Sequence, residues 1–307
     1  MATIKQLGRR ADRLSGGHRL CGGCGAPIIA RHLLLATEHP VVVTCATGCL
    51  EVSTTIYPYT AWKTPFIHSA FENAAATISG LYSAYVSLKR QGKIAQETKF
   101  LAIGGDGGTY DIGIQALSGA LERGHDFVYC CYNNEAYMNT GVQRSSATPH
   151  WGRTTTSPVG SQVPGKPQPR KDLTEIVAAH NPPYVAQTSV GSWRDLHRKA
   201  EKAFQIEGPC FINALSPCPL GWITDPAKTV EICKIAADTC FWPLYEVEQG
   251  EYKVNYKPKQ KLPVEAYLEP QGRFRHLLRP ENKHLVQQIQ DEVDRSWERL
   301  LKRAGEA

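Results

Sequence analysis

A glycine-rich turn and an asparagine pair form the part of the sequence best suited to chemistry. The turn, Gly105-Asp106-Gly107-Gly108, follows one short apolar run, and Asn133-Asn134 ends the next, with twenty-five residues between Gly107 and Asn133. Glycines let a backbone approach a phosphate closely, and a helix that begins behind them offers free N–H groups and a positive dipole end. Asp106 and Asn134 add the hard oxygen ligands that Mg²⁺ prefers. The pattern predicts a site for a diphosphate group held with a magnesium ion.

Three predicted elements position these residues. Phe100–Ile103 is expected to be a buried strand, residues 109–122 a helix, and Phe127–Tyr132 a second strand. This order favours two parallel strands joined by a right-handed crossover. Ligands of such sheets bind outside the carboxyl ends of the strands, where Asp106 and Asn134 both fall.

Four of the ten cysteines form a second candidate site. Cys21 and Cys24 form a CxxC motif in a glycine-rich loop. Cys49 lies in a turn after a predicted strand, and Cys218 lies between two prolines. Four thiolates suit a [4Fe–4S] cluster, but a four-cysteine zinc site stays open because ligand type alone does not separate the two. The other cysteines lie in or beside apolar segments and are expected to be buried, unreactive thiols: Cys45, Cys130, Cys131, Cys210, Cys233 and Cys240.

Together these motifs resemble a known family. Gly105-Asp106-Gly107 followed by Asn133-Asn134 is similar to the metal and diphosphate motif of thiamine diphosphate enzymes. The sequences EAYMNTG at 135–141, CGGCGAP at 21–27 and ATGCLEVS at 46–53 narrow the resemblance to the β subunit of pyruvate:ferredoxin oxidoreductase and related 2-oxoacid:ferredoxin oxidoreductases. The resemblance covers about residues 15–240.

The resemblance implies cofactors and roles for individual residues. Thiamine diphosphate and Mg²⁺ are implied, with the metal held by Asp106, Asn134 and the backbone carbonyl of Ala136. Asn139 is implied as the catalytic residue that faces the thiazolium ring and the substrate. Cys21, Cys24, Cys49 and Cys218 are implied as ligands of the [4Fe–4S] cluster nearest the thiamine. The residues implied in cofactor binding are Gly48, Gly105, Asp106, Gly107, Gly108, Asn134, Ala136, Asn139, Thr140 and Gly141.

The resemblance also implies an activity and partners. The activity is oxidative decarboxylation of a 2-oxoacid, most directly pyruvate, with coenzyme A as acyl acceptor and ferredoxin as electron acceptor. The partners are α-, γ- and δ-type subunits in a hetero-oligomer that is itself dimerised. In the family the glutamate that activates thiamine comes from another subunit, and Glu51 and Glu72 match no such role here. The chain is therefore expected to be inactive alone.

One departure from the family pattern leaves the substrate open. Relatives have small residues after the Thr-Pro pair, whereas this chain has His150, Trp151 and Arg153 in that region. A bulky ring and a cation near the expected substrate loop admit a more anionic substrate, such as oxalate. Two further alternatives stay open: a non-oxidative thiamine-dependent decarboxylase or synthase half without a cluster, and a zinc-stabilised, non-catalytic binding subunit.

Composition narrows the class of protein. With 307 residues, 42% hydrophobic and 21% charged, the chain is expected to be soluble and globular. It has no run of 18 apolar residues and no signal-peptide pattern, so no membrane span is expected and a cytoplasmic location is predicted. The net charge of +6 is mild and scattered, which argues against a nucleic-acid partner.

Strands and helices alternate through residue 215, which predicts an α/β fold. We expect a mainly parallel sheet with helices on both faces, as in thiamine diphosphate-binding domains, with a long helix over about Ser69–Arg90. The cofactor-binding domain is expected to cover 1–240 and a C-terminal extension 241–307. The extension is predicted to hold a β-hairpin and an amphipathic helix over Leu285–Leu301 that packs on partner subunits.

Overall fold

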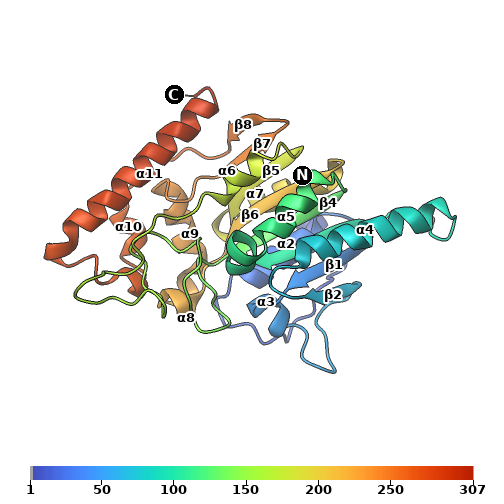
Figure 1. The fold of residues 1–307 in the computed structure, drawn as a ribbon, viewed down its shortest axis with the longest axis horizontal. Coiled ribbons are helices and arrows are strands. Elements are labelled where there is room, and N and C mark those ends of the chain that lie inside the picture. Colours follow the sequence, from blue (N-terminus) through green and yellow to red (C-terminus); the bar gives the residue numbers. More distant parts are fainter. Residues whose placement is uncertain (1–2, 307) are drawn as a thin grey trace.

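The computed structural model describes residues 3–306, and its centre is one eight-stranded sheet (Figure 1). The strands lie in the order β2-β1-β3-β4-β6-β5-β7-β8. Neighbours from β2 to β5 pair in parallel, while β7 is antiparallel to β5 and β8 is antiparallel to β7. This arrangement confirms the predicted α/β class. The strands are β1 (Val41–Ala46), β2 (Phe66–Ser69), β3 (Lys99–Gly105), β4 (Phe127–Asn133), β5 (Tyr184–Ser189), β6 (Pro209–Leu215), β7 (Tyr245–Glu248) and β8 (Glu251–Val254).

Two hydrophobic cores cover the two faces of the sheet, as predicted. Side chains of α2, α7 and α9 pack in one core, and side chains of α4, α5 and α6 pack in the other. Every residue of β4 is buried, which is typical of a central parallel strand covered on both faces. The helices are α1 (Ile4–Leu7), α2 (Ala26–Leu35), α3 (Cys49–Val52), α4 (Ala74–Arg90), α5 (Ile114–Glu122), α6 (Leu173–Ala178), α7 (Trp193–Gln205), α8 (Pro219–Trp222), α9 (Thr229–Asp238), α10 (Glu265–Leu268) and α11 (Lys283–Arg303).

Two local predictions were wrong in detail. The long helix begins at Ala74 rather than near Ser69, because Phe66–Ser69 forms the parallel edge strand β2 beside β1. A run of four residues is too short for its apolar pattern to separate strand from helix. The helix expected over 109–122 is divided into a π-helix, Gly107–Ile112, and α5. The two helices meet at Gly113, and a Cβ atom added to Gly113 would lie 2.2 Å from the carbonyl oxygen of Gly108.

The C-terminal segment continues the same sheet. The predicted hairpin is present as β7 and β8, and Val247 of β7 pairs with Val185 of β5. Helix α11 lies along one side of the molecule, with its C-terminal end near β8 (Figure 1). It buries Leu285, Ile289 and Val293 against its own chain. Contact of this extension with partner subunits stays a prediction.

Among residues 3–306, none of the helices combines the length and the apolar character needed to cross a bilayer.

Candidate active site

The three predicted metal ligands meet at the carboxyl ends of β3 and β4. The register pairs Gly105 with Tyr132, so the residues that follow each strand lie side by side. The side-chain amide of Asn134 lies 2.8 Å from both Oδ1 of Asp106 and the carbonyl oxygen of Ala136. When its nitrogen faces them, Asn134 donates two hydrogen bonds; when its oxygen faces them, three oxygens converge on one point. That oxygen set fits a divalent cation such as Mg²⁺.

Asp106 is fully buried and held on both oxygens. Its Oδ1 accepts from the backbone N–H of Asn134 at 3.1 Å, and its Oδ2 accepts from the hydroxyl of Ser145 at 2.5 Å. Burial raises the pKa of Asp106 to about 7, and these two hydrogen bonds oppose the rise because they favour the charged form. A cation at the same oxygens would favour the carboxylate further.

The predicted cofactor residues line a narrow pocket beside this point. Bare backbone is required there: a Cβ on Gly107 would lie 2.4 Å from the Tyr137 ring, and one on Gly48 would lie 2.5 Å from the Tyr132 hydroxyl. Gly141 does not line the pocket and instead occupies a turn at a φ of +120°. The lining residues are Thr47, Gly48, Cys49, Phe71, Gly105, Gly107, Gly108, Tyr132, Asn134, Ala136, Tyr137, Met138, Asn139 and Thr140.

The four predicted cluster cysteines lie around the same end of the sheet. The loop of Cys21 and Cys24 is joined to that of Cys218 by a 3.3 Å hydrogen bond from the Gly25 N–H to the Pro217 carbonyl. Cys49 lines the cofactor pocket, close to Asn139. The pKa of Cys24 is raised to about 12, mainly by burial and in smaller part by Cys218, Cys49 and Cys21, since like charges repel. That the four thiols share one cluster stays a prediction.

The spacing and surroundings of these thiols bear on the choice between zinc and a cluster. Among the described residues, no three His, Cys, Asp or Glu side chains lie close enough to hold a single metal ion. The choice between a zinc site and a [4Fe–4S] cluster at these cysteines stays a prediction. The Gly221 N–H donates to Sγ of Cys218 at 3.4 Å, a contact that favours a thiolate.

The six other cysteines are buried, as expected. Burial raises the pKa of all of them above the ordinary range, which leaves them as unreactive thiols. They are Cys45, Cys130, Cys131, Cys210, Cys233 and Cys240.

No glutamate is among the described residues that line the cofactor pocket. Glu51 is buried outside it, where its carboxylate accepts from the Thr55 hydroxyl at 2.6 Å and lies 3.4 Å from Nε2 of His68.

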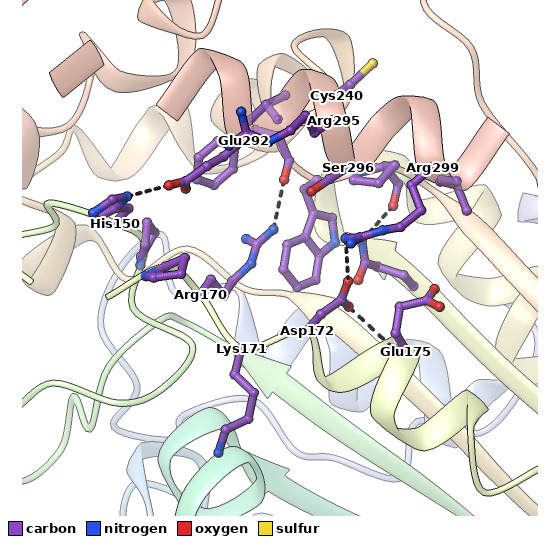
Figure 2. Close-up of a pocket in the computed structure, with 18 of the residues that line it drawn as sticks. His150, Arg170, Lys171, Asp172, Glu175, Cys240, Glu292, Arg295, Ser296 and Arg299 are labelled. Carbon is purple, nitrogen blue, oxygen red and sulfur yellow. Dashed lines mark hydrogen bonds and ion pairs between the residues drawn. The ribbon is translucent and has the colours of Figure 1, made fainter. Parts of the chain in front are cut away.

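His150 and Trp151, which departed from the family pattern, lie against α11 rather than in the cofactor pocket. Nδ1 of His150 lies 2.7 Å from Glu292, and the Trp151 indole donates to Gln288 at 3.2 Å. His150 lines a separate cavity of about 340 Å³ beneath α11, shown in Figure 2. Contact with α11 therefore explains the bulky residues His150 and Trp151, and an influence of this segment, including Arg153, on the choice of substrate stays a prediction.

Several residues that support the site were missed from the sequence. Tyr132 and Phe71 fix the glycine positions, and Trp222 donates from Nε1 to the carbonyl of Asn134 at 2.8 Å. Glu135 pairs with Arg273, which is 138 residues away. Only Glu135 lies within a recognised motif; nothing local to Arg273 or Phe71 marks them as part of a site.

Comparison with known proteins identifies the family. Residues 43–214 match the family described as thiamine pyrophosphate enzyme, C-terminal TPP binding domain. Pyruvate synthase subunit PorB of Thermotoga maritima is 54% identical over 309 residues, covering 97% of this chain and 95% of that protein. The same subunit of Methanocaldococcus jannaschii is 53% identical, covering 93% and 95%. The chain belongs to the PorB family of thiamine pyrophosphate enzymes.

One further relative is named for another substrate, and one solved structure shares the fold of this chain. Ketoisovalerate oxidoreductase subunit VorB of Pyrococcus abyssi is 42% identical, covering 95% of this chain and 94% of that protein. The 2-oxoglutarate:ferredoxin oxidoreductase from Magnetococcus marinus shares the fold, with a TM-score of 0.55 at 18% identity over 73% of this chain and 79% of that one. PorB-family chains are subunits of thiamine-dependent enzymes, so this chain is part of an enzyme.

Proposed function

We propose that this chain is the thiamine diphosphate-binding β subunit of a pyruvate:ferredoxin oxidoreductase, or pyruvate synthase. The observation that carries the proposal is the convergence of Asp106, Asn134 and Ala136 beside a glycine-lined pocket, with the loops of four cysteines at the same end of the sheet. Mg²⁺ binds the three oxygens, and the proximal [4Fe–4S] cluster binds Cys21, Cys24, Cys49 and Cys218.

Each part of the chain has a task in this reaction. The bare backbone at Gly107 and Gly108 accommodates the diphosphate, and Asp106 anchors its metal. Thiamine diphosphate supplies an electron sink for decarboxylation, and the cluster supplies one-electron transfer toward ferredoxin. Asn139 lines the pocket beside Cys49, where it orients the substrate by hydrogen bonding. The six buried cysteines have no task in this proposal.

The activating glutamate comes from a partner subunit, because none of the described residues at the pocket is a glutamate. The enzyme is accordingly a hetero-oligomer with α-, γ- and δ-type subunits, it uses coenzyme A, and the isolated chain is inactive. Pyruvate is favoured as substrate by the names of the relatives most similar to this chain. Ketoisovalerate is the second candidate, since a VorB subunit is 42% identical. Oxalate stays a further alternative, because Arg153 supplies the cation that admitted it.

The test is carried out on the reconstituted complex. We expect thiamine diphosphate to bind with Mg²⁺, four irons with sulfide rather than zinc on this chain, and faster reduction of ferredoxin with pyruvate than with ketoisovalerate, 2-oxoglutarate or oxalate. Asp106→Asn is expected to weaken Mg²⁺-dependent cofactor binding while the cluster's electron paramagnetic resonance signal persists. Asp126→Asn, at the opposite end of β4, is the matched control and should bind normally. Zinc in place of iron, or normal cofactor binding by Asp106→Asn, would contradict the proposal.

A further inference from the structure

Glu135 occupies an unusual place between two proposed metal ligands. It lies between Asn134 and Ala136 and is wholly buried, with its backbone in the left-handed region at a φ of 67°. Its N–H donates to Oδ1 of Asn133 at 3.0 Å, and its carbonyl accepts from the Thr148 hydroxyl at 2.6 Å. A non-glycine residue in this region is strained unless its surroundings hold it there. The carboxylate provides a further restraint.

Two arginines from distant segments hold the Glu135 carboxylate. Oε2 of Glu135 accepts from Nη2 of Arg273, in the C-terminal extension, and Oε1 lies 3.3 Å from Nη1 of Arg170. The side chains of Glu135 and Arg273 are 0% and 3% exposed, so neither charge is solvated if the other is lost. Arg170 also donates to the carbonyl of Phe241 at 3.1 Å, a contact drawn in Figure 2.

Arg273 is itself rigidly placed. Its Nε and Nη2 donate to Oε1 of Gln271 at 3.0 and 2.7 Å, and its guanidinium lies 4.0 Å above the centre of the Trp222 ring. The Trp222 indole donates to the carbonyl of Asn134 at 2.8 Å. Glu135, Arg273, Trp222 and Asn134 therefore form a closed set of contacts around the turn.

The same turn is connected to the cysteine site. Trp222 ends α8, which begins directly after Cys218, and a Cβ on Gly221 would lie 2.2 Å from Sδ of Met138. Met138 belongs to the cofactor loop, so α8 contacts that loop at two points.

We propose that Glu135 and Arg273 are a positioning pair that fixes the Asn134 side chain and the Ala136 carbonyl in the geometry that binds the metal–diphosphate group. The inference rests on the proposed function, since it assumes that this group binds there. Residues that hold metal ligands in place without touching the metal contribute to its affinity, and their loss typically lowers that affinity about 10- to 100-fold. The C-terminal extension thus supplies a residue on which the cofactor site depends.

The experiment uses the reconstituted complex and measures two quantities for each variant: the dissociation constant of thiamine diphosphate at saturating Mg²⁺, and the midpoint of thermal unfolding. Glu135→Gln and Arg273→Met are each expected to weaken cofactor binding about 10-fold or more. The double variant removes both charges, so its midpoint should recover relative to Glu135→Gln, while its cofactor affinity stays low. Recovery of affinity in the double variant would overturn the proposal, as would affinities within about two-fold of the unmodified complex in both single variants.

Lys199→Met is the matched control for loss of a buried charge. Lys199 is fully buried in α7 and lies 2.7 Å from Asp195, away from the cofactor pocket. The Lys199→Met substitution is expected to lower the unfolding midpoint without changing cofactor affinity. A loss of affinity equal to that of Glu135→Gln would overturn the positioning role.

The Asp106→Asn variant separates failure of the positioning role from failure of the proposed function. If it abolishes binding while Glu135→Gln does not, only the inference fails; if it binds normally, the proposed function fails and the inference with it.

Discussion

At the scale of single residues, the site is built from oxygens that a parallel register brings together. Asp106 and Asn134 each follow a strand, and β3 and β4 are neighbours, so both side chains reach the same end of the sheet. The buried Asp106 carboxylate accepts hydrogen bonds from the Ser145 hydroxyl and from the Asn134 N–H. A buried carboxylate lowers the stability of the folded chain unless a cation lies beside it. Its presence here therefore fits a metal ligand.

Gly107 provides a residue-scale prediction. Gly107→Ala would place a methyl group 2.4 Å from the Tyr137 ring, whose hydroxyl donates to the Gly107 carbonyl at 2.7 Å. The ring and the cofactor loop must then move, so thiamine diphosphate binding is expected to weaken by about 10-fold or more. Isothermal titration of the reconstituted complex measures the change.

Gly80→Ala is the control for this substitution. Gly80 is exposed within α4 and a Cβ there meets nothing within 4 Å. Alanine should stabilise the helix by about 0.5–1 kcal/mol and leave cofactor binding unchanged. Equal affinities for Gly107→Ala and Gly80→Ala would show that the pocket does not need bare backbone.

At the scale of elements, the order of strands and helices was predictable because it depends on local patterns. The buried strands are short apolar runs, and α7 and α11 show helical spacing of apolar residues. The edge strand β2 and the π-helix were missed, since one is only four residues long and the other depends on contacts of Gly113 with distant backbone. The candidate ligands were predictable because each lies at an end of such an element.

The contact between α2 and α7 gives a prediction for acid stability. His32 of α2 stacks with Trp193, and its ring centre lies 5.5 Å from that of His197. Burial, with a contribution from His197, lowers the pKa of His32 to about 4 from an ordinary value of about 6.5. The unfolded chain therefore binds more protons between these values, so stability falls as the pH drops through that window.

His32→Phe removes this titration and should make the chain less sensitive to acid, by up to about 3 kcal/mol at pH 4. Urea unfolding between pH 4 and pH 8 measures the difference. His284→Phe, at an exposed position of α11, should leave the pH profile unchanged. An unaltered profile for His32→Phe would contradict the assignment.

At the scale of the whole molecule, the contacts that complete the site join segments far apart in the chain. Arg273 reaches Glu135 from 138 residues away, and His150 meets Glu292 from 142 residues away. No periodicity or motif encodes such pairs, because they depend on where loops and helices are placed by the sheet. This explains why the positions of the candidate ligands could be predicted from sequence, while the contacts of Arg273 and His150 could not.

The position of α11 provides a prediction at this scale. Ile289 is 2% exposed in the core that α11 shares with its own chain. Ile289→Ala is therefore expected to destabilise the isolated full chain by about 2–4 kcal/mol, measured by chemical unfolding. Gln287→Ala, at an exposed position two residues away in the same helix, should change stability little. Equal stabilities would mean that α11 is held by partner subunits instead.

The ion pair between Glu135 and Arg273 also has a consequence for biosynthesis. A ribosome must add 138 residues after Glu135 before Arg273 is made, which takes on the order of ten seconds at ordinary elongation rates. During translation the first half of the sheet can form while the buried acid still lacks this counterion. If the pair positions the metal ligands as proposed, we expect the nascent chain to take up cofactor only after Arg273 has left the exit tunnel.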